Sequence, residues 1–125
     1  MAPSNSNGKS YIGNPYMTKD MKRQVLKLMV LRRIRAGRAY SYAIIKELGN
    51  EHLSMFLKKD TGSVKNDVYN TINALERSGY IKFTPASKLA GGKKYCVITA
   101  QGRSVLLESK RLFIESMKEL MKILG

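Results

Sequence analysis

The sequence predicts a mainly α-helical protein with one small β-hairpin and a long helix at its C-terminal end. Three observations predict this fold class. Apolar residues recur at helical spacing in several segments before residue 79 and again after residue 99. Between them, the periodicity of residues 80–84 and 94–99 changes to the alternation of apolar and polar side chains that is typical of strands. Ser, Thr and Gly stand where the helices would begin and end.

The N-terminal part is predicted to contain an arm followed by a helix. Residues 1–17 are rich in Ser, Asn, Gly and Pro, which is typical of a disordered arm. A helix is expected over residues 19–35, with Thr18 as its N-cap and Gly37 just beyond its end. Its apolar residues form two stripes, so we expect one stripe to pack in the chain's own core and the other against a partner chain.

Two shorter segments follow this helix. Ser41 is expected to cap a second helix that ends at Gly49 and turns its apolar side chains inward. Residues 50–62 are predicted to form either a helical extension or an ordered loop that packs apolar side chains on the core.

A third helix is predicted over residues 64–78, with Ser63 as its N-cap and an apolar face in the core. Its opposite face holds three asparagines, although asparagine is a poor helix former. Asn can bond adenine in two places and Lys or Arg can bond guanine, so this face is typical of a helix that reads base edges in the major groove. The alternative is a solvated polar face with no partner.

A basic hairpin is expected after the third helix. Two strands, over 80–84 and 94–99, are joined by a loop that is too long for a tight turn and carries several lysines. We expect one face of the hairpin to hold Ile81, Phe83, Tyr95 and Val97. A basic loop of this kind, residues 85–94, is typical of a wing that follows phosphates or the minor groove. The alternative is a surface hairpin whose lysines serve solubility.

The last helix is predicted over residues 100–124, with Thr99 as its cap. It is too long and too apolar for a domain of this size to cover. We therefore expect it to pack against a second copy of the chain through a coiled-coil-like seam. The alternative is that its apolar residues pack only within their own chain. Residues 18–99 would then form the DNA-binding domain, and 100–125 the dimerisation helix.

The net charge of the chain is +14, from 23 Lys and Arg residues against 9 Asp and Glu residues. Such an excess favours a polyanionic partner, with nucleic acid first and an anionic membrane second. No apolar run approaches the length of a membrane span, and the apolar surface of the first helix is too widely spread for a membrane-facing stripe. We therefore expect duplex DNA to be the partner, and we do not expect the protein to bind a membrane.

Catalytic chemistry has little support in this composition. The chain has one cysteine, Cys96, and one histidine, His52, which leaves no disulfide and no two-histidine metal site within a chain. We expect Cys96 to be a small buried apolar residue. No enzymatic activity, no cofactor and no metal are expected, and the predicted location is the cytoplasm, in association with the nucleoid.

The predicted order is helix, helix, polar-faced helix, hairpin and long helix, which is that of a winged helix-turn-helix with a dimerising tail. With this order of elements, the chain resembles the PadR family of transcriptional regulators. Three blocks carry the resemblance in the right order over about residues 21–106, namely AYSYAIIKEL, VYNTINALERSGYI and GGKKYCVITAQGR. Departures from the family pattern include Ser41 in place of a glycine, and Lys65, Asn66 and Asn70 at positions where Pro or Gly is common.

The resemblance implies a dimeric repressor whose last helix packs on the partner's first helix. Tyr69 matches the tyrosine of the family's recognition helix, Lys94 and Tyr95 match its wing, and Gly102 and Arg103 match the start of its last helix. The candidate DNA-binding residues are Ser41, Tyr42, Lys65, Asn66, Tyr69, Asn70, Asn73, Arg77, Lys88, Lys93 and Lys94. The candidate dimer-interface residues are Leu26, Val30, Ile34, Leu106, Phe113, Met117, Leu120 and Leu124.

Three functional alternatives remain open from the sequence. The first is a sequence-specific regulator, and the second is an architectural, chromatin-like protein that coats DNA with little sequence preference. The third is an RNA-binding or protein-binding winged helix, although no exposed aromatic platform for RNA is evident. The resemblance also implies a flat aromatic effector at the dimer interface, near Phe113 and Met117, whereas such residues at helical spacing are commonly plain core.

Overall fold

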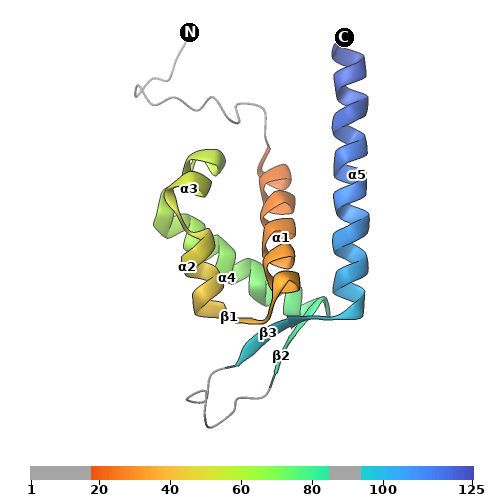
Figure 1. Ribbon diagram of the computed structural model, residues 1–125. Coiled ribbons are helices and arrows are strands. Elements are labelled where there is room, and N and C mark those ends of the chain that lie inside the picture. Colours follow the sequence, from red (N-terminus) through yellow and green to blue (C-terminus); the bar gives the residue numbers. More distant parts are fainter. Residues whose placement is uncertain (1–17, 85–93) are drawn as a thin grey trace.

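The computed structural model describes residues 18–84 and 94–125, which are mainly helical and include a small sheet (Figure 1). The predicted fold class is thereby confirmed. The arm predicted for residues 1–17 and the wing residues Lys88 and Lys93 lie outside the described residues. In chain order the elements are α1 (Lys19–Ala36), β1 (Ala39–Tyr40), α2 (Ser41–Leu48), α3 (Glu51–Leu57), α4 (Thr61–Arg77), β2 (Ile81–Phe83), β3 (Tyr95–Ile98) and α5 (Ala100–Leu124).

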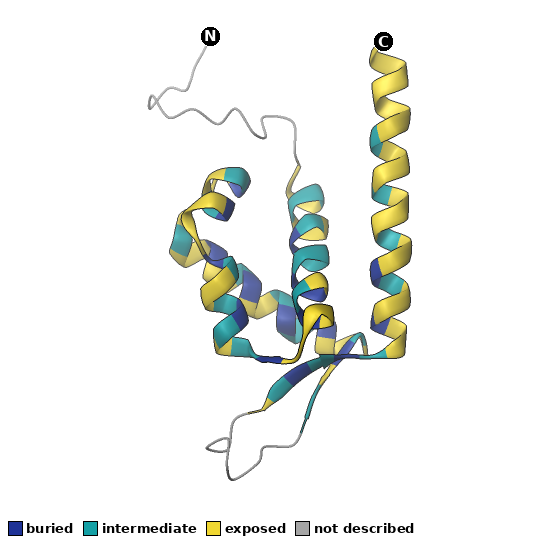
Figure 2. Cartoon of the chain, viewed as in Figure 1, coloured by how far each residue is buried: buried dark blue, intermediate teal, exposed yellow. Residues whose placement is uncertain are grey.

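The core lies where α1, α2 and α4 face one another and the sheet closes one end. Figure 2 shows the buried residues on these facing sides, whereas α5 is exposed along most of its length. Fully burying a Val, Leu or Ile side chain contributes about 1.5–3 kcal/mol relative to leaving it exposed. The helical residues that form most of this core are Leu26, Val30, Leu31, Ile34, Ile44, Val64, Val68, Ile72 and Leu75.

Four residues predicted to meet a partner chain belong to this core instead. Leu26, Val30 and Ile34 of α1 are at most 4% exposed, and Leu106 of α5 is 3% exposed. Helical spacing shows that two apolar stripes exist, but it does not show which stripe faces the chain's own core. The assignment of these four residues to a dimer interface is therefore wrong, because a single chain already covers them.

The first and last helices begin where the sequence predicted. The Thr18 hydroxyl accepts a hydrogen bond from the Met21 N–H at 3.2 Å, and the Thr99 hydroxyl accepts one from the Gly102 N–H at 3.0 Å. Each bond satisfies a backbone donor that has no partner within the first turn of its helix. Both predicted N-caps are confirmed.

The third predicted helix begins earlier than expected. Asp60, rather than Ser63, is its N-cap, because the Asp60 carboxylate accepts from the Ser63 N–H at 2.8 Å. Asp and Ser are similarly good caps. The residue type therefore did not decide between the two positions, and α4 starts at Thr61.

The segment between the first and third predicted helices contains two short helices. Ser41 is the first residue of α2 rather than its cap, since Tyr40 holds the N-cap position without a side-chain hydrogen bond. Within residues 50–62, Glu51–Leu57 form a separate helix, α3, rather than an extension of α2 or a loop. The Asn50 side chain accepts a hydrogen bond from the Leu53 N–H at 2.8 Å and caps this helix.

The sheet has the antiparallel order β1-β3-β2. Ile81 of β2 pairs with Ile98 of β3, and both are buried together with Cys96. Tyr95 and Val97 therefore lie on the opposite face of β3 from these residues. The expectation that they share a face with Ile81 was wrong, because a shift of one residue turns every side chain of a strand over. Strand β1 is too short to be recognised by alternation.

Helix α5 leaves the sheet at a close backbone contact. A Cβ atom at Gly102 would collide with the carbonyl oxygen of Tyr80. The Thr99 N–H donates to the same Tyr80 oxygen at 3.0 Å, and the Thr99 hydroxyl donates to the Gly79 carbonyl at 2.7 Å. Gly79 has a φ of 81°, in the left-handed region that favours glycine. The end of α4 and the start of α5 are thus joined through their backbones.

Candidate nucleic-acid interface

One face of α4 presents polar side chains to solvent. We call it the polar face of α4. Its buried side, with Val68, Ile72 and Leu75, anchors the helix as predicted. Asn73 is half-buried, and the other members of the face are exposed. The polar face consists of Lys65, Asn66, Tyr69, Asn70, Asn73 and Arg77.

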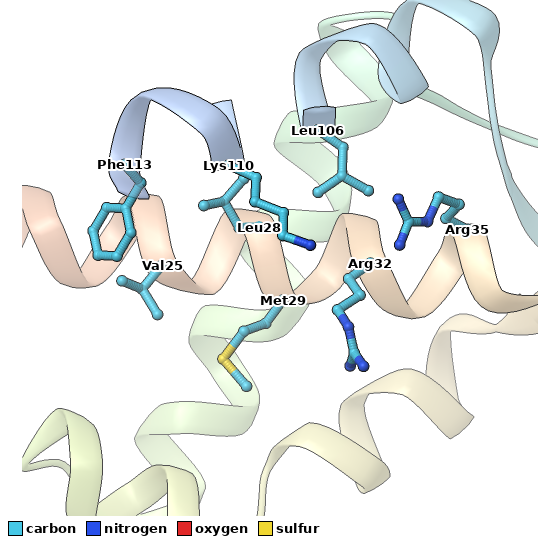
Figure 3. Close-up of a pocket in the computed structure, with 8 residues that line it drawn as sticks. All are labelled: Val25, Leu28, Met29, Arg32, Arg35, Leu106, Lys110 and Phe113. Atoms are coloured by element: carbon cyan, nitrogen blue, oxygen red, sulfur yellow. The ribbon is translucent and has the colours of Figure 1, made fainter. Parts of the chain in front are cut away.

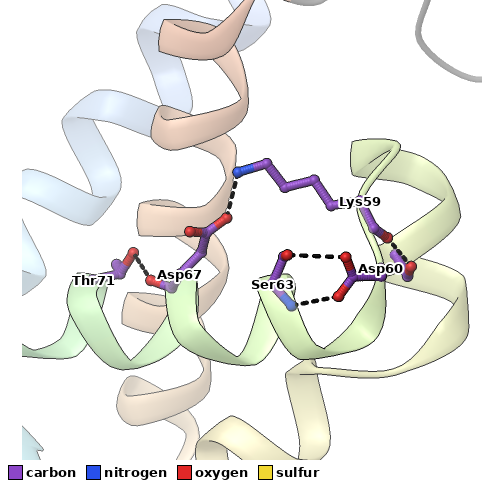
Figure 4. A network of polar contacts seen from close by, with 6 residues as sticks. Lys59, Asp60, Ser63, Asp67 and Thr71 are labelled. Carbon is purple, nitrogen blue, oxygen red and sulfur yellow. Dashed lines mark hydrogen bonds and ion pairs between the residues drawn. The ribbon is translucent and has the colours of Figure 1, made fainter.

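The carboxylates near the start of α4 are engaged within the protein (Figure 4). The Lys59 ammonium donates to Asp67 at 2.7 Å, and the Asp60 carboxylate accepts from both the N–H and the hydroxyl of Ser63. The backbone hydrogen bond from Ser63 is the main cause that holds the pKa of Asp60 below its ordinary value. Within the described ranges, neither Lys65 nor Arg77 takes part in an ion pair. The polar face is therefore free to attract an anion.

Two exposed tyrosines lie on the paired helices α2 and α4, which pack against each other. Tyr42, at the start of α2, is 72% exposed, and Tyr69 of α4 is 52% exposed. Large aromatic side chains left this open are available to contact a partner. Both were candidate DNA-binding residues, and both lie on the surface of the described chain.

Ser41 does not share this exposure. It is half-buried, and its hydroxyl oxygen lies 3.4 Å from the sulfur of Cys96 in the sheet. Cys96 is buried, as predicted, and burial raises the pKa of its thiol. The Ser41 side chain thus links α2 to β3, and its role as a DNA contact stays a prediction.

The base of the wing carries an aromatic stack that the sequence analysis did not predict. The rings of Tyr40 and Tyr95 are stacked, with centroids 4.6 Å apart and planes at 15°. The guanidinium carbon of Arg38 lies 4.8 Å from the centre of the Tyr95 ring. Lys94, next to Tyr95, is exposed. The pairing of β1 with β3 produces this stack, and no spacing in the sequence indicates that pairing.

A fork of hydrogen bonds fixes the turn between α1 and α2. Arg33 donates to both carboxylate oxygens of Glu47, at 2.7 and 3.2 Å, and to the carbonyl of Gly37 at 3.1 Å. Hydrogen bonding from Arg33 holds the pKa of Glu47 below its ordinary value. Planar Arg–carboxylate pairs of this geometry are specific in orientation. The turn that leads into β1 is therefore held in one conformation.

An open pocket of about 210 Å³ lies between α1 and α5 (Figure 3). The pocket lies within one chain, whereas the expected effector site was at a dimer interface. Phe113 of α5 is among its lining residues, and Met117 is not. The pocket combines apolar side chains with three cationic ones. The lining residues are Val25, Leu28, Met29, Arg32, Arg35, Leu106, Lys110 and Phe113.

Beyond the pocket, α5 exposes a long apolar surface. Leu120 is 45% exposed and Leu124 is 77% exposed, while Phe113 and Met117 are half-buried. Exposed apolar surface of this extent is typical of an interface. The large apolar residues that α5 exposes are Leu107, Leu112, Ile114, Leu120, Met121, Ile123 and Leu124.

Neither a metal-binding cluster nor a membrane-spanning helix occurs in the part of the chain that the structure describes. It contains no group of three His, Cys, Asp or Glu residues that could hold a metal ion. Its helices include none that is both long and apolar enough to cross a membrane.

The arrangement of α2, α4 and the β2–β3 hairpin defines a winged helix-turn-helix protein. Comparisons with protein-family models and with curated proteins gave no match. Among solved structures, a PadR-like transcriptional regulator from Bacillus cereus is similar, with a TM-score of 0.63 and 26% identity. The alignment covers 86% of this chain and 98% of that chain.

Two further solved structures have the same fold. A transcriptional regulator from Clostridium thermocellum has a TM-score of 0.66 and 20% identity, covering 86% of this chain and 98% of that chain. A PadR family transcription regulator from Clostridium difficile has a TM-score of 0.61 and 22% identity, covering 80% and 98%. The resemblance of this chain to PadR-family transcriptional regulators is thereby confirmed.

Proposed function

We propose that this chain is a DNA-binding transcriptional regulator that acts as a homodimer and represses its target. The observation that carries the proposal is the polar face of α4, which offers amide and cationic groups to solvent on a winged helix-turn-helix frame. The similar solved structures, described as PadR-like or PadR family transcription regulators, support the same reading.

In this proposal α4 enters the major groove with its polar face toward the bases. Asn66, Asn70 and Asn73 would accept and donate hydrogen bonds at base edges, adenine being the base that Asn can bond in two places. Lys65 and Arg77 would bind guanine or the flanking phosphates. Lys94 and the wing would follow the backbone beside the groove.

The second subunit would cover the apolar surface of α5. That surface extends to the last turn of the helix, where Leu120 and Leu124 remain exposed in the single chain. A second copy of the same helix supplies a matching apolar face and turns two exposed surfaces into one buried seam. The two α4 helices would then read half-sites separated by about 34 Å or a multiple of it, one turn of DNA.

An architectural protein that coats duplex DNA is the second candidate, and the net charge of +14 favours it. The two candidates differ in sequence preference. A repressor should bind its specific site about 10³-fold or more tightly than random DNA, whereas the ratio for an architectural protein should be near one. No enzymatic activity, cofactor or metal is part of either candidate.

Fluorescence anisotropy on two labelled duplexes separates these candidates. One duplex has a random sequence and the other comes from upstream of the protein's own gene. The titrations run across roughly 50 to 300 mM salt, with unlabelled random DNA as competitor. Survival of the upstream complex at high salt supports a sequence-reading regulator. Equal binding to both duplexes, with equal loss as salt rises, supports the architectural protein.

The pocket between α1 and α5 is where an effector would bind. Its apolar lining and its three cations, Arg32, Arg35 and Lys110, suit a flat aromatic molecule that carries a negative charge. Such a ligand would contact both helices and could change how α5 is placed for dimerisation. Tryptophan is absent from the chain, so stacking would depend on Phe113.

A further inference from the structure

The outer face of the sheet carries a cationic and aromatic stack that the candidate DNA-binding residues did not include. Tyr40 of β1 pairs directly with Tyr95 of β3, and their rings are stacked at 4.6 Å. Their hydroxyl groups are hydrogen-bonded at 3.1 Å. The guanidinium carbon of Arg38 lies 4.8 Å from the centre of the Tyr95 ring.

Arg38 is exposed and held in place at the same time. The bonds from Arg33 to Glu47 and to the Gly37 carbonyl fix the turn immediately before it. The cation–π contact with Tyr95 attracts the charge of the guanidinium and does not require its N–H groups to bind a carboxylate, so they can donate to an anion. No ion pair of Arg38 occurs among the described residues.

The position of Arg38 connects two parts of the proposed interface. Three residues after it, α2 begins, and Tyr42 is exposed in the first turn of that helix. Across the sheet, Lys94 is exposed next to the Tyr95 ring on which Arg38 lies. Lys82 also points to this outer face, because it pairs with Val97 rather than with a core residue. A run of positive charge thus extends from the start of α2 to the wing.

We propose that Arg38 binds a phosphate of the duplex DNA backbone, and that Tyr95 and Tyr40 are positioning residues that hold its guanidinium in place. This inference rests on the proposed function, since it requires duplex DNA as the partner. An arginine that is already oriented loses little conformational freedom when it binds, and its planar fork can donate two hydrogen bonds to one phosphate. The contact would lie beside the bases that α4 reads and would add affinity without sequence preference.

Three variants and one control test this role by anisotropy on random duplex DNA at several salt concentrations. R38Q removes the charge, R38K keeps the charge without the planar fork, and Y95F keeps the ring without the hydroxyl bond to Tyr40. The control is K118Q, which also removes one positive charge, from an exposed position on the distal half of α5. Circular dichroism confirms that each variant is folded.

We expect R38Q to weaken binding about tenfold, as loss of a charged hydrogen bond should. It should also flatten the slope of log affinity against log salt by about 0.9 for each bound chain, the value for one lost phosphate contact. R38K should keep the slope but bind several-fold more weakly than the unchanged protein. Y95F should keep the slope and lose less affinity than R38K, and K118Q should change neither quantity appreciably.

The outcomes separate this inference from the function on which it rests. If the unchanged protein binds duplex DNA and R38Q behaves like K118Q, Arg38 does not contact a phosphate, and the proposed function stands without it. If R38Q loses affinity with an unchanged salt slope, Arg38 has only a structural role, and the inference is again wrong. If the unchanged protein does not bind duplex DNA at all, both proposals are overturned.

Discussion

Gly102, in the first turn of α5, lies so close to the carbonyl oxygen of Tyr80 that no side chain fits between them. The Thr99 N–H donates to the same oxygen, so this point joins the end of α4 to the start of α5. The resemblance to the PadR family also marks Gly102. The structure supplies the physical reason for glycine at this position.

A methyl group at this position should therefore destabilise the protein. We expect Gly102→Ala to lower the free energy of unfolding by about 2 kcal/mol or more, since a collision with backbone can be relieved only by moving α5. Chemical denaturation followed by circular dichroism measures the change. Gly37→Ala is the matched control, because a Cβ atom there meets nothing within 4 Å and should alter stability by less than about 0.5 kcal/mol. Equal effects of the two changes would contradict the close-contact explanation.

The asparagines of α4 should determine sequence preference rather than general affinity. We expect Asn70→Ala or Asn73→Ala to cost about 1–3 kcal/mol at the preferred site if that residue makes a bidentate base contact. Binding to random duplex DNA should change little. Selection of bound sequences from a random pool, followed by anisotropy on the selected site, measures both quantities. An equal loss on every sequence would mean that these side chains contact the backbone instead.

The distal part of α5 should hold the dimer together. Leu120→Glu places a charge in the apolar surface that we assign to the second copy, so sedimentation should show a shift from dimer to monomer. Ser104→Glu puts the same charge at an exposed position of the same helix, on the side that carries Arg111 and Lys118, and should leave the dimer intact. A dimer that persists in Leu120→Glu would place the subunit contact elsewhere.

Asp60, the N-cap of α4, should make the stability of the protein fall as the pH is lowered into the acid range. The folded-state pKa of Asp60 is lowered, mainly by the backbone hydrogen bond from Ser63. Its contribution is therefore present above the unfolded-state pKa of about 3.9 and is lost as the pH falls through the folded-state value. Asp60→Asn retains a capping oxygen without a charge, so its melting temperature should fall less than that of the unchanged protein between neutral pH and acid. Parallel acid dependence in the two proteins would assign the effect to other carboxylates.

Most helices of this protein could be predicted from its sequence because they have a local signature, whereas α3 was left open between a helix and a loop. Thr18 and Thr99 are capping residues directly before apolar periodic segments, and both cap as expected. Cap prediction failed at Ser63 and Ser41, because Asp60 and Tyr40 hold the N-cap positions of α4 and α2 instead. The chemistry of the side chains allows either residue to be the N-cap in such cases. The residue at which the helix begins then depends on how the helix packs on the core.

Features that depend on long-range pairing could not be predicted. The stack of Arg38, Tyr40 and Tyr95 requires β1 to pair with β3, which brings together residues more than fifty positions apart. In the same way, the sequence shows two apolar stripes on α1 but does not identify Val30 as core rather than interface. Which face of a helix is covered depends on how the other elements are arranged.

Helix α5 packs most tightly against the rest of the chain near one end, and Phe113 and Met117 farther along it are only half-buried. Its buried residues, Gly102 and Leu106, both lie within its first two turns. A helix of 25 residues is about 37 Å long, so a tilt of about 10° at its base would displace its tip by about 6 Å. In a dimer joined through α5, the tilt of α5 would set the distance between the two α4 helices. A ligand that widens or narrows the space between α1 and α5 would therefore change the number of base pairs between the two half-sites that such a dimer can bind.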